Sequence, residues 1–522
     1  MVELTSTHLS TPYIFGAIVL LYVGYFISQR LYSDAQIRKL GARAPIRTSY
    51  LPYGIDTAYQ VVKSAMRDKT YDMWIDTFEK WCGPGRYTIE VGVGRRVLMT
   101  AEPENIKAIL ATQFKDYGKG EVFRQDWHAF LGNDTNGDAD GLDLGIFTTD
   151  GQLWHNSRQL IRPQFVKDRL SDIDIFEEHT QILISKIEQS PEIDTLDMMF
   201  RYTLDAATHF LLGQSVGSLE EPQTVFADAF YNAQRVQSII ARVGPLNWLV
   251  PRKRMGFYDS INTINDFVST FIDKALALSS QELQEKTNHD EGYTFLHAIA
   301  GYTRDRAMLR DQLVSVLLAG RDTTACTLTW AIYHLSMDAS ITAKLRQEII
   351  QTVGLDRKPT YEHLKSMKYL QHILNETLRL YPVVPYNVRI SLKDTTLPTG
   401  GGPDGKQPIG ILAGTPIGYS TLIMQRRADL YPAPSPSFPP PAAFAPERWD
   451  AWTPKSWTYV PFNGGPRICI GQQFALTEMG YTLVRLFQRF ERVENRMPRG
   501  VEPGLHADIV LQPAKEVRVA FA

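Results

Sequence analysis

The segment that most constrains the fold is residues 305–335, a long stretch without a proline. Apolar residues recur along it at the spacing of one helix face. They are Leu309, Leu313, Val316, Leu317 and Leu328. A helix of about 30 residues rises roughly 1.5 Å per residue, so it would cross a whole domain. Gly320 interrupts this helix in mid-course, which indicates a place to expect a cofactor. The length alone is equally compatible with a plain core helix.

The rest of the chain predicts one mainly helical domain. From about residue 55 to residue 522 there is no second linker, no repeat of fixed period and no coiled-coil heptad. Strand-like alternation is confined to short pieces at residues 87–99 and 409–419. The chain has 522 residues and 44% hydrophobic content, enough for one large core or two ordinary ones. We therefore expect a mainly α fold with a smaller β-sheet region.

Two loops rich in glycine or proline have plain structural interpretations. The glycines at 400–402 lack the Lys-Ser/Thr of a phosphate loop, and Pro403-Asp404-Gly405 predicts a turn before a strand. Residues 432–446 contain seven prolines, so this run is neither helix nor central strand. We expect an extended surface connection there.

Charge and cysteine content exclude several kinds of function. The 55 Lys and Arg nearly balance the 57 Asp and Glu, so no global field indicates nucleic acid as a partner. The three cysteines, Cys82, Cys326 and Cys469, are too few and too far apart for a disulfide framework. The 11 histidines form no His-Glu-x-x-His pair, and no cysteine has a second one nearby. The spacing therefore gives no indication of a zinc site.

The N-terminus predicts a membrane anchor. Residues 13–27 are an uninterrupted apolar, aromatic and glycine run, which flanking residues extend to 13–32. A cleaved signal peptide has a basic leading segment before its apolar run. Here the first Lys or Arg is Arg30, and the basic residues follow the run, which favours an uncleaved anchor. We expect a short lumenal segment (1–12), a transmembrane anchor (13–32), a linker (33–54) and one catalytic domain (55–522). The expected location is the endoplasmic reticulum membrane, single-pass, with the domain in the cytosol.

Cys469 is the strongest candidate for chemistry. Two glycines and a proline precede it, and an amphipathic helical pattern follows, so it lies in a loop ahead of a helix N-terminus. Backbone N–H groups and the helix dipole favour a thiolate there. The glycines let the backbone approach a flat ligand, and Arg467 offers a cation to a carboxylate or simply to solvent. A lone cysteine elsewhere is more often a buried structural residue.

Residues 462–471 resemble the haem-ligand signature of the cytochrome P450 superfamily, Phe-x-x-Gly-x-Arg-x-Cys-x-Gly, at every specified position. The resemblance implies that Cys469 binds the iron of haem b as a thiolate. It also implies a set of haem-binding residues: Cys469, Arg467, Trp154, Arg158, Arg389 and Phe462. Trp154 and Arg158 belong to a Trp-x-x-x-Arg pattern whose two members share one helix face.

Two further segments match the same family in its order. Residues 319–324 resemble the oxygen-activating motif: small residues leave room for dioxygen, Thr323 offers a hydroxyl, and Asp322 relays protons. The same residues also fit a polar helix surface or a local kink. Glu376 and Arg379 resemble the family's Glu-x-x-Arg, which implies a buried structural network completed by Arg448.

The resemblance implies monooxygenation, in which one atom of dioxygen leaves as water and the other enters a C–H bond. No flavin or iron–sulfur segment is present, so electrons from NADPH would arrive through a separate membrane-bound reductase. Candidate contacts for it are Arg162, Lys167 and Arg169, although most such charges are solvated surface.

The substrate is expected to be hydrophobic. Residues 145–151, 394–405 and 471–478 resemble the fungal microsomal alkane and fatty-acid hydroxylase branch, which implies oxidation at or near the end of a long chain. The proline-rich run departs from that branch. A tailoring oxidase of fungal secondary metabolism could share every feature. Ala319 stands where animal fatty-acid hydroxylases carry a haem-linking Glu, so no covalent haem ester is expected. Four segments are candidate pocket walls, with core packing as the alternative: 123–131, 236–248, 383–385 and 508–511.

Overall fold

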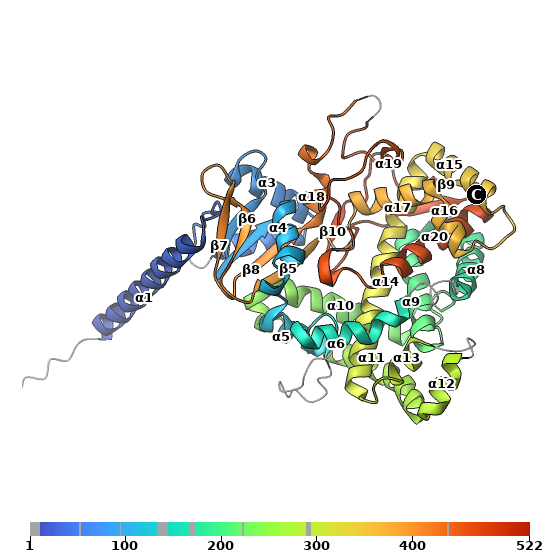
Figure 1. The fold of residues 1–522 in the computed structure, drawn as a ribbon, viewed down its shortest axis with the longest axis horizontal. Helices are drawn as coiled ribbons and strands as arrows, with labels where there is room; N and C mark the ends of the chain where they lie inside the picture. Colours follow the sequence, from blue (N-terminus) through green and yellow to red (C-terminus); the bar gives the residue numbers. More distant parts are fainter. Residues whose placement is uncertain are drawn as a thin grey trace, which may run out of the picture.

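The computed structural model describes residues 11–51, 54–93, 95–132, 145–165, 173–221, 224–288, 294–435 and 438–522. Helices form most of the body, and a smaller sheet region lies at one side of it, next to the end of α1 (Figure 1). This arrangement agrees with the predicted mainly α fold with a smaller β region.

The α-helices are α1 (Thr11–Leu40), α2 (Ile55–Ala65), α3 (Thr70–Cys82), α4 (Pro103–Lys107), α5 (Gly120–Leu131), α6 (Gly151–Ile161), α8 (Asp174–Glu188), α9 (Thr195–Leu212), α10 (Val225–Val243), α11 (Phe257–Ala277), α12 (Ser280–Asn288), α13 (Phe295–Ala300), α14 (Arg306–Met337), α15 (Ala339–Thr352), α16 (Tyr361–Ser366), α17 (Lys368–Leu380), α18 (Thr421–Arg426), α19 (Arg448–Ala451) and α20 (Gln472–Arg489). Short helical turns used below are η4 (Arg162–Phe165), η5 (Gly244–Leu249) and η7 (Gly465–Arg467).

The strands are β1 (Thr88–Val93), β2 (Arg95–Thr100), β3 (Tyr117–Gly118), β4 (Ile193–Asp194), β5 (Tyr386–Ser391), β6 (Thr395–Gly401), β7 (Gln407–Ile411), β8 (Pro416–Ser420), β9 (Val493–Asn495), β10 (Leu505–Ala507), β11 (Leu511–Pro513) and β12 (Arg518–Phe521).

The predicted long helix is confirmed as α14, which runs through the middle of the body (Figure 1). Asp305 starts it, because its carboxylate accepts hydrogen bonds from the backbone N–H groups of Ala307 and Met308. Its N-terminal half belongs to one apolar cluster with α10 and α11, and its C-terminal half belongs to another with α17 and α20. α14 therefore joins the two largest parts of the core.

The strand-like segments each form two strands rather than one. Residues 87–99 become the antiparallel pair β1–β2, and residues 409–419 divide between β7 and β8. The main sheet has the order β1-β2-β8-β5-β3, in which β2 pairs with β8 in parallel. β6 and β7 form a separate hairpin whose turn follows the glycines at 400–402, as the sequence predicts.

Helix α1 continues through residues 33–40, so the first part of the predicted linker is helical, and the linker boundaries stay a prediction. Its end is attached to the sheet region: the Ala42 N–H donates to the Pro408 carbonyl at 2.8 Å, and the Gly410 N–H donates to the Ala42 carbonyl at 3.0 Å. Gly410 lies against the Ile37 carbonyl so closely that a Cβ would overlap it. The end of α1 is therefore packed directly against β7.

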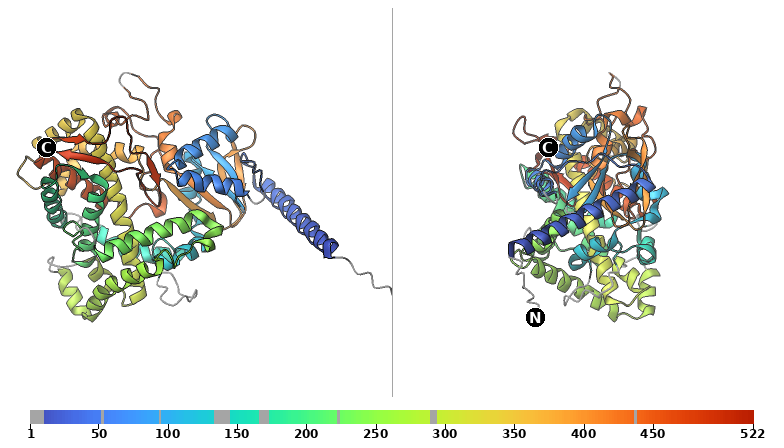
Figure 2. Two further views of the ribbon diagram at one scale, coloured as in Figure 1. Left: turned by 180° about the vertical axis from the view of Figure 1, so that it is seen from behind. Right: turned by 90° about the vertical axis from the view of Figure 1, so that its left-hand side faces the viewer.

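The rest of α1 projects away from the body (Figure 2). Its apolar side chains, among them Ile18, Leu20 and Leu21, are exposed. Within the described ranges, no helix combines the length and the apolar character needed to cross a membrane. The anchor over 13–32 remains a prediction, and the predicted lumenal segment falls mostly on residues 1–10, outside those ranges.

The Glu-x-x-Arg pair forms the buried network that the resemblance implies. The Glu376 carboxylate lies 2.7 Å from the Arg379 Nε atom and 3.3 Å from the Arg448 Nε atom, and none of the three side chains is exposed. Arg448 also donates to the carbonyls of Pro439 and Pro440, in the proline-rich run. This run, predicted as a surface connection, therefore supplies part of the buried network through its carbonyl groups.

Candidate functional site

The loop before α20 holds Cys469 in a defined position. The Cys469 N–H donates to the Phe462 carbonyl at 3.0 Å, which closes the loop at the predicted residues. Gly465 has a φ of 66° and its backbone touches the Leu110 carbonyl, so a side chain would not fit there. Gly471 ends the loop and α20 begins at Gln472. The thiol is exposed and forms no disulfide.

The surroundings of Cys469 both oppose and favour the thiolate. Enclosure by neighbouring groups raises the pKa of the thiol, although Cys469 is exposed. A hydrogen bond from the Gly471 backbone and the charge of Arg158 lower that pKa. Cys469 is therefore accessible to a ligand, and two groups are placed to stabilise a negative charge on its sulfur.

Four basic side chains from four parts of the chain lie near one another beside this loop. They are Lys119, Arg158, Arg389 and Arg467. Burial and the charges of Arg389 and Arg158 together lower the pKa of Arg467 to about 10, although the charge of Asp150 opposes them. Burial and the charges of Arg389 and Arg467 likewise lower the pKa of Lys119. This mutual repulsion is unfavourable unless an anion is bound.

Asp150 is the carboxylate within this basic group. It accepts hydrogen bonds from the backbone N–H groups of Lys119 and Gly120, and it lies 2.6 Å from the Arg467 guanidinium. Trp154 lies one turn later on α6, with the guanidinium of Arg467 4.7 Å from its ring and that of Arg158 5.9 Å from it. The predicted residues Trp154, Arg158 and Arg467 thus come together.

This arrangement fits a haem. Four cations against one carboxylate leave positive charge in excess, and two propionate groups would neutralise most of it. The Arg467 Nε atom is buried and has no hydrogen-bond partner in the part of the chain that the structure describes. The accessible sulfur of Cys469 supplies the ligand that iron needs. Phe462 contributes through its backbone carbonyl, and Arg389 through its charge.

One face of α14 is less buried than the rest of the helix. Between residues 309 and 333 every side chain is buried except those of Val316, Ala319, Gly320 and Thr323, which are half-buried. These positions lie three or four residues apart and so form one stripe along the helix. Small residues in the middle of the stripe leave room beside the helix backbone, as the motif predicts.

Thr323 and Asp322 occupy different environments. The Thr323 hydroxyl lies on the stripe and donates to the Ala319 carbonyl at 2.8 Å, the local back-bond that the alternative interpretation anticipates. Asp322 is buried instead, where its carboxylate accepts from the Gln234 amide of α10 at 2.6 Å and lies 3.1 Å from Arg321. Burial raises the pKa of Asp322, whereas Arg321 and Gln234 lower it. Asp322 and Thr323 are therefore neighbours in sequence that face different partners.

Several residues of the site were not predicted from the sequence, because little or nothing in the pattern around them marks a functional role. Lys119 and Asp150 come together only through tertiary structure, although Asp150 directly precedes α6. Gln234 lies on the buried face of the amphipathic helix α10, and a polar residue on an apolar face is the signal that marks it. Glu478 of α20 is fully buried, hydrogen-bonds Thr324, and has its pKa raised to about 8 by burial.

The predicted pocket segments adjoin in pairs. The Gln237 amide donates to the Asp126 carbonyl at 2.9 Å, which joins segments 236–248 and 123–131. The Leu511 N–H donates to the Val383 carbonyl at 2.9 Å, which joins segments 508–511 and 383–385. Which of these side chains face a substrate stays a prediction.

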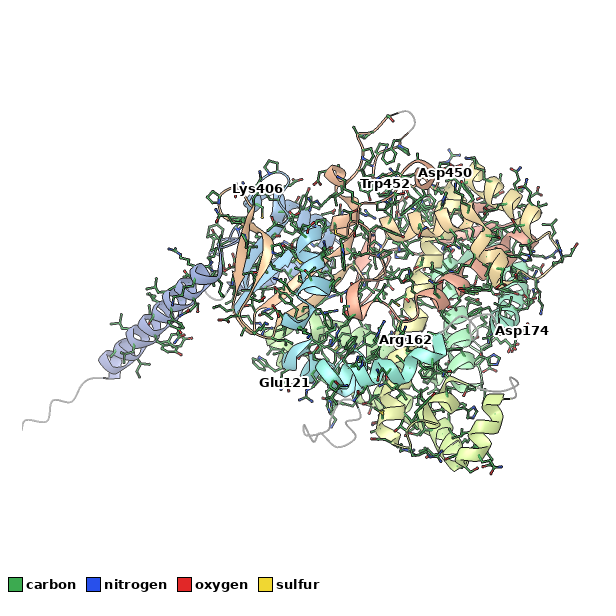
Figure 3. All side chains as sticks on the ribbon, viewed as in Figure 1. Glu121, Arg162, Asp174, Lys406, Asp450 and Trp452 are labelled. Atoms are coloured by element: carbon green, nitrogen blue, oxygen red, sulfur yellow. The ribbon has the colours of Figure 1, made fainter. Side chains whose placement is uncertain are left out.

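Of the predicted reductase contacts, only Arg162 is among the residues that the structure describes. It is exposed at the end of α6 (Figure 3). Lys167 and Arg169 lie outside the described residues.

Comparisons with known proteins identify the family of the chain. The cytochrome P450 family model matches residues 93–521. Cytochrome P450 monooxygenase pvhE of Talaromyces variabilis is 49% identical, covering 97% of this chain and 95% of its own length. Cytochrome P450 52A1 of Candida tropicalis is 40% identical, covering 80% of this chain and 77% of its own. The crystal structure of the cytochrome P450DA haem domain, 19% identical, has the same fold, with a TM-score of 0.72 over 92% of this chain and 98% of that one. A cysteine loop that fits thiolate-bound haem, together with these matches, shows that the chain belongs to the cytochrome P450 family and is a monooxygenase.

Proposed function

We propose that the enzyme inserts one oxygen atom from O2 into a terminal or near-terminal C–H bond of a long-chain fatty acid or alkane. The half-buried stripe of α14 carries the proposal, because Val316, Ala319 and Gly320 offer an apolar surface beside the Thr323 hydroxyl. The resemblance to the fungal alkane and fatty-acid hydroxylase branch supports the substrate class.

Each residue of the site has a defined task in this proposal. A haem b supplies dioxygen activation when bound, and Cys469 is its thiolate ligand. Arg467, Arg389, Arg158, Lys119 and Trp154 hold its propionates. Thr323 turns its hydroxyl from the Ala319 carbonyl toward dioxygen, and Asp322 delivers protons by breaking its contact with Arg321 or Gln234.

Electrons come from NADPH through a membrane-bound reductase, because no described segment resembles an electron-carrying domain. The proposed docking face lies over the Cys469 loop and the end of α6, where Arg162 is exposed. A basic side chain there would meet acidic groups of a partner. The balanced overall charge gives no support for nucleic acid as a partner.

We also propose that α1 attaches the enzyme to the endoplasmic reticulum membrane, single-pass, with the domain in the cytosol. Exposed apolar residues on this projecting helix support the proposal, since water solvates them poorly. Removing residues 1–40 should shift the protein from the membrane fraction to the supernatant after alkaline extraction. An unchanged distribution would contradict the role of α1.

A second candidate is a tailoring oxidase of fungal secondary metabolism. The Talaromyces variabilis relative is 49% identical, against 40% for the Candida tropicalis protein. This higher identity to a protein outside the 52A1 group supports the second candidate. The two candidates differ in substrate and share the reaction.

A spectral titration distinguishes the candidates. The reduced carbon monoxide complex should absorb near 450 nm, which establishes thiolate ligation. Fatty acids, alkanes and polyketide-like lipids are then added to the oxidised enzyme and the change of spin state is followed. We expect long-chain substrates to shift the spectrum and, with reductase and NADPH, to give a hydroxylated product by mass spectrometry. Turnover of only the polyketide-like lipids would favour the second candidate.

A further inference from the structure

Three side chains that the monooxygenase reaction does not use meet where α8 packs against α9. Glu178 and His179 are adjacent on α8, and His209 lies in the last turn of α9. The Nε2 atom of His179 lies 3.1 Å from the Nδ1 atom of His209. A Glu178 carboxylate oxygen lies 3.9 Å from the same Nδ1 atom. Asp174, labelled in Figure 3, marks the start of α8 on the outside of the molecule.

The spacing of these atoms suits a tetrahedral metal ion. One ligand atom from each side chain lies within 4.8 Å of the other two, and in the described ranges this is the only such group of His, Cys, Asp and Glu. Zinc binds imidazole nitrogen and carboxylate oxygen at about 2.0 to 2.2 Å, which puts neighbouring ligand atoms about 3.3 to 3.6 Å apart. The observed 3.1 Å and 3.9 Å bracket that range, so small side-chain rotations would complete the geometry.

The two histidines have complementary environments. His179 is 1% exposed, so its imidazole is enclosed between the two helices and points one nitrogen at His209. Its Nδ1 atom has no hydrogen-bond partner in the described part of the chain, so Nε2 is the atom directed at the group. His209 and Glu178 reach the surface, which leaves an entry path and room for a water ligand.

We propose that Glu178, His179 and His209 bind one Zn²⁺ ion, with water in the fourth position, and that the ion links α8 to α9. Two imidazole nitrogens and one carboxylate oxygen form a ligand set that suits zinc better than it suits magnesium or calcium. The bound ion would hold His209 in place next to Phe210. The ring of Phe210 lies 4.7 Å from that of Phe474 in the first turn of α20, directly after the Cys469 loop. The proposed zinc ion therefore stabilises the packing behind the haem-binding loop.

Zinc retention by the untagged, full-length, haem-loaded protein tests this site. The protein is dialysed against Zn²⁺ and its metal content is measured separately for zinc and iron. We expect close to one zinc ion per chain, and a zinc affinity more than about tenfold weaker in His209→Gln and in Glu178→Gln. Glu188→Gln is the matched control, because it removes the same charge from α8 about 15 Å along the helix. It should bind zinc like the wild type.

Two further measurements keep the test decisive. The reduced carbon monoxide spectrum confirms that each variant still folds and holds haem. If a variant fails this check, the zinc X-ray absorption of the wild type decides, since imidazole ligands give nitrogen scattering at about 2.0 Å with characteristic outer-shell features. Absence of zinc from the dialysed wild type, equal zinc affinity in folded His209→Gln, or a first shell without imidazole would each overturn the proposal.

Discussion

Asp322 and Thr323 are adjacent on α14, but their side chains point to different surroundings. Successive positions point about 100° apart, so Thr323 faces the internal stripe while Asp322 is buried against α10. Gln234 and Arg321 hold the Asp322 carboxylate in place. If protons pass through Asp322, those two contacts determine how readily the carboxyl group releases and regains them.

Replacing Thr323 by alanine should uncouple electron use from product formation. The variant loses the hydroxyl that is proposed to interact with dioxygen, so more of the electrons from NADPH should reduce dioxygen to hydrogen peroxide instead of forming product. We expect the ratio of product to NADPH consumed to fall about tenfold or more. Thr323→Ser keeps the hydroxyl and should retain most of the coupling. Unchanged coupling in the alanine variant would contradict the relay role of Thr323.

Replacing Gln234 by leucine should raise the pKa of Asp322 further. The Gln234 amide lowers that pKa by hydrogen bonding to the charged carboxylate, so its loss favours the protonated form. The acid side of the pH profile for coupled turnover should therefore move to higher pH. Gln237→Leu, on the same helix, lies outside the contact with Asp322 and serves as the control. Identical pH profiles for the two variants would argue against a positioning role for Gln234.

At the scale of elements, α17 and the proline-rich run are joined through buried charge. Glu376 of α17 is paired with Arg379 and Arg448, and it also accepts from the Trp449 indole at 3.0 Å. Proline has no N–H group but keeps its carbonyl, so Pro439 and Pro440 are well suited to accept from Arg448. An extended loop is thereby tied to a core helix without regular secondary structure.

Replacing Glu376 by glutamine should destabilise the protein by about 3 to 5 kcal/mol, because two buried guanidinium groups lose their anion. The midpoint of urea unfolding of the haem-loaded protein measures this loss. Asp450→Asn is the matched control: Asp450 pairs with Lys368 at 2.6 Å on the surface (Figure 3), and both side chains are more than half exposed. That change should cost less than about 1 kcal/mol. Equal midpoints for the two variants would contradict the structural role of the buried network.

At the scale of the whole molecule, one cluster of charges connects three distant parts of the chain. His506 of β10 lies 2.5 Å from Asp68, in the turn between α2 and α3, and 3.8 Å from Asp508. Asp508 in turn lies 2.9 Å from Arg242, at the end of α10. The hairpin β10–β11 is therefore attached to both the sheet side and the helical side of the body.

The attachment through His506 should weaken as pH rises. Hydrogen bonds to Asp508 and Asp68 raise the pKa of His506 above its ordinary value of 6.5, despite partial burial. A raised pKa in the folded state contributes stability that is complete below about pH 6.5 and is lost as pH rises through the folded-state pKa. The difference in unfolding midpoint between wild type and His506→Gln should therefore be largest near pH 6 and should shrink by about pH 9. A difference that does not vary with pH would contradict this linkage.

Much of the fold follows from local patterns. The long helix over 305–335 and the loop-then-helix around Cys469 were predictable, because helical periodicity, glycines and prolines act over neighbouring residues. The segments 87–99 and 409–419 were predicted only as strand-like, because the pairing of β1 with β2 and the assignment of β7 and β8 to different sheets depend on tertiary contacts. The continuation of α1 to Leu40 depends on contacts with β7 that the sequence does not show.

The sequence by itself predicted the haem-thiolate chemistry, through one motif around Cys469 and Arg467 and another around Thr323. The residues within each motif are close along the chain, so their types and spacing are visible without a structure. Only the tertiary structure decided which distant side chains surround them: Lys119 and Asp150 beside Arg467, and Gln234 against Asp322. The proposed zinc site shows the same limit. Its spacing in sequence, 30 residues between His179 and His209, indicated no metal site. Packing of α8 on α9 brings the two rings within 3.1 Å, because contacts between helices depend on faces and crossing geometry rather than on distance along the chain.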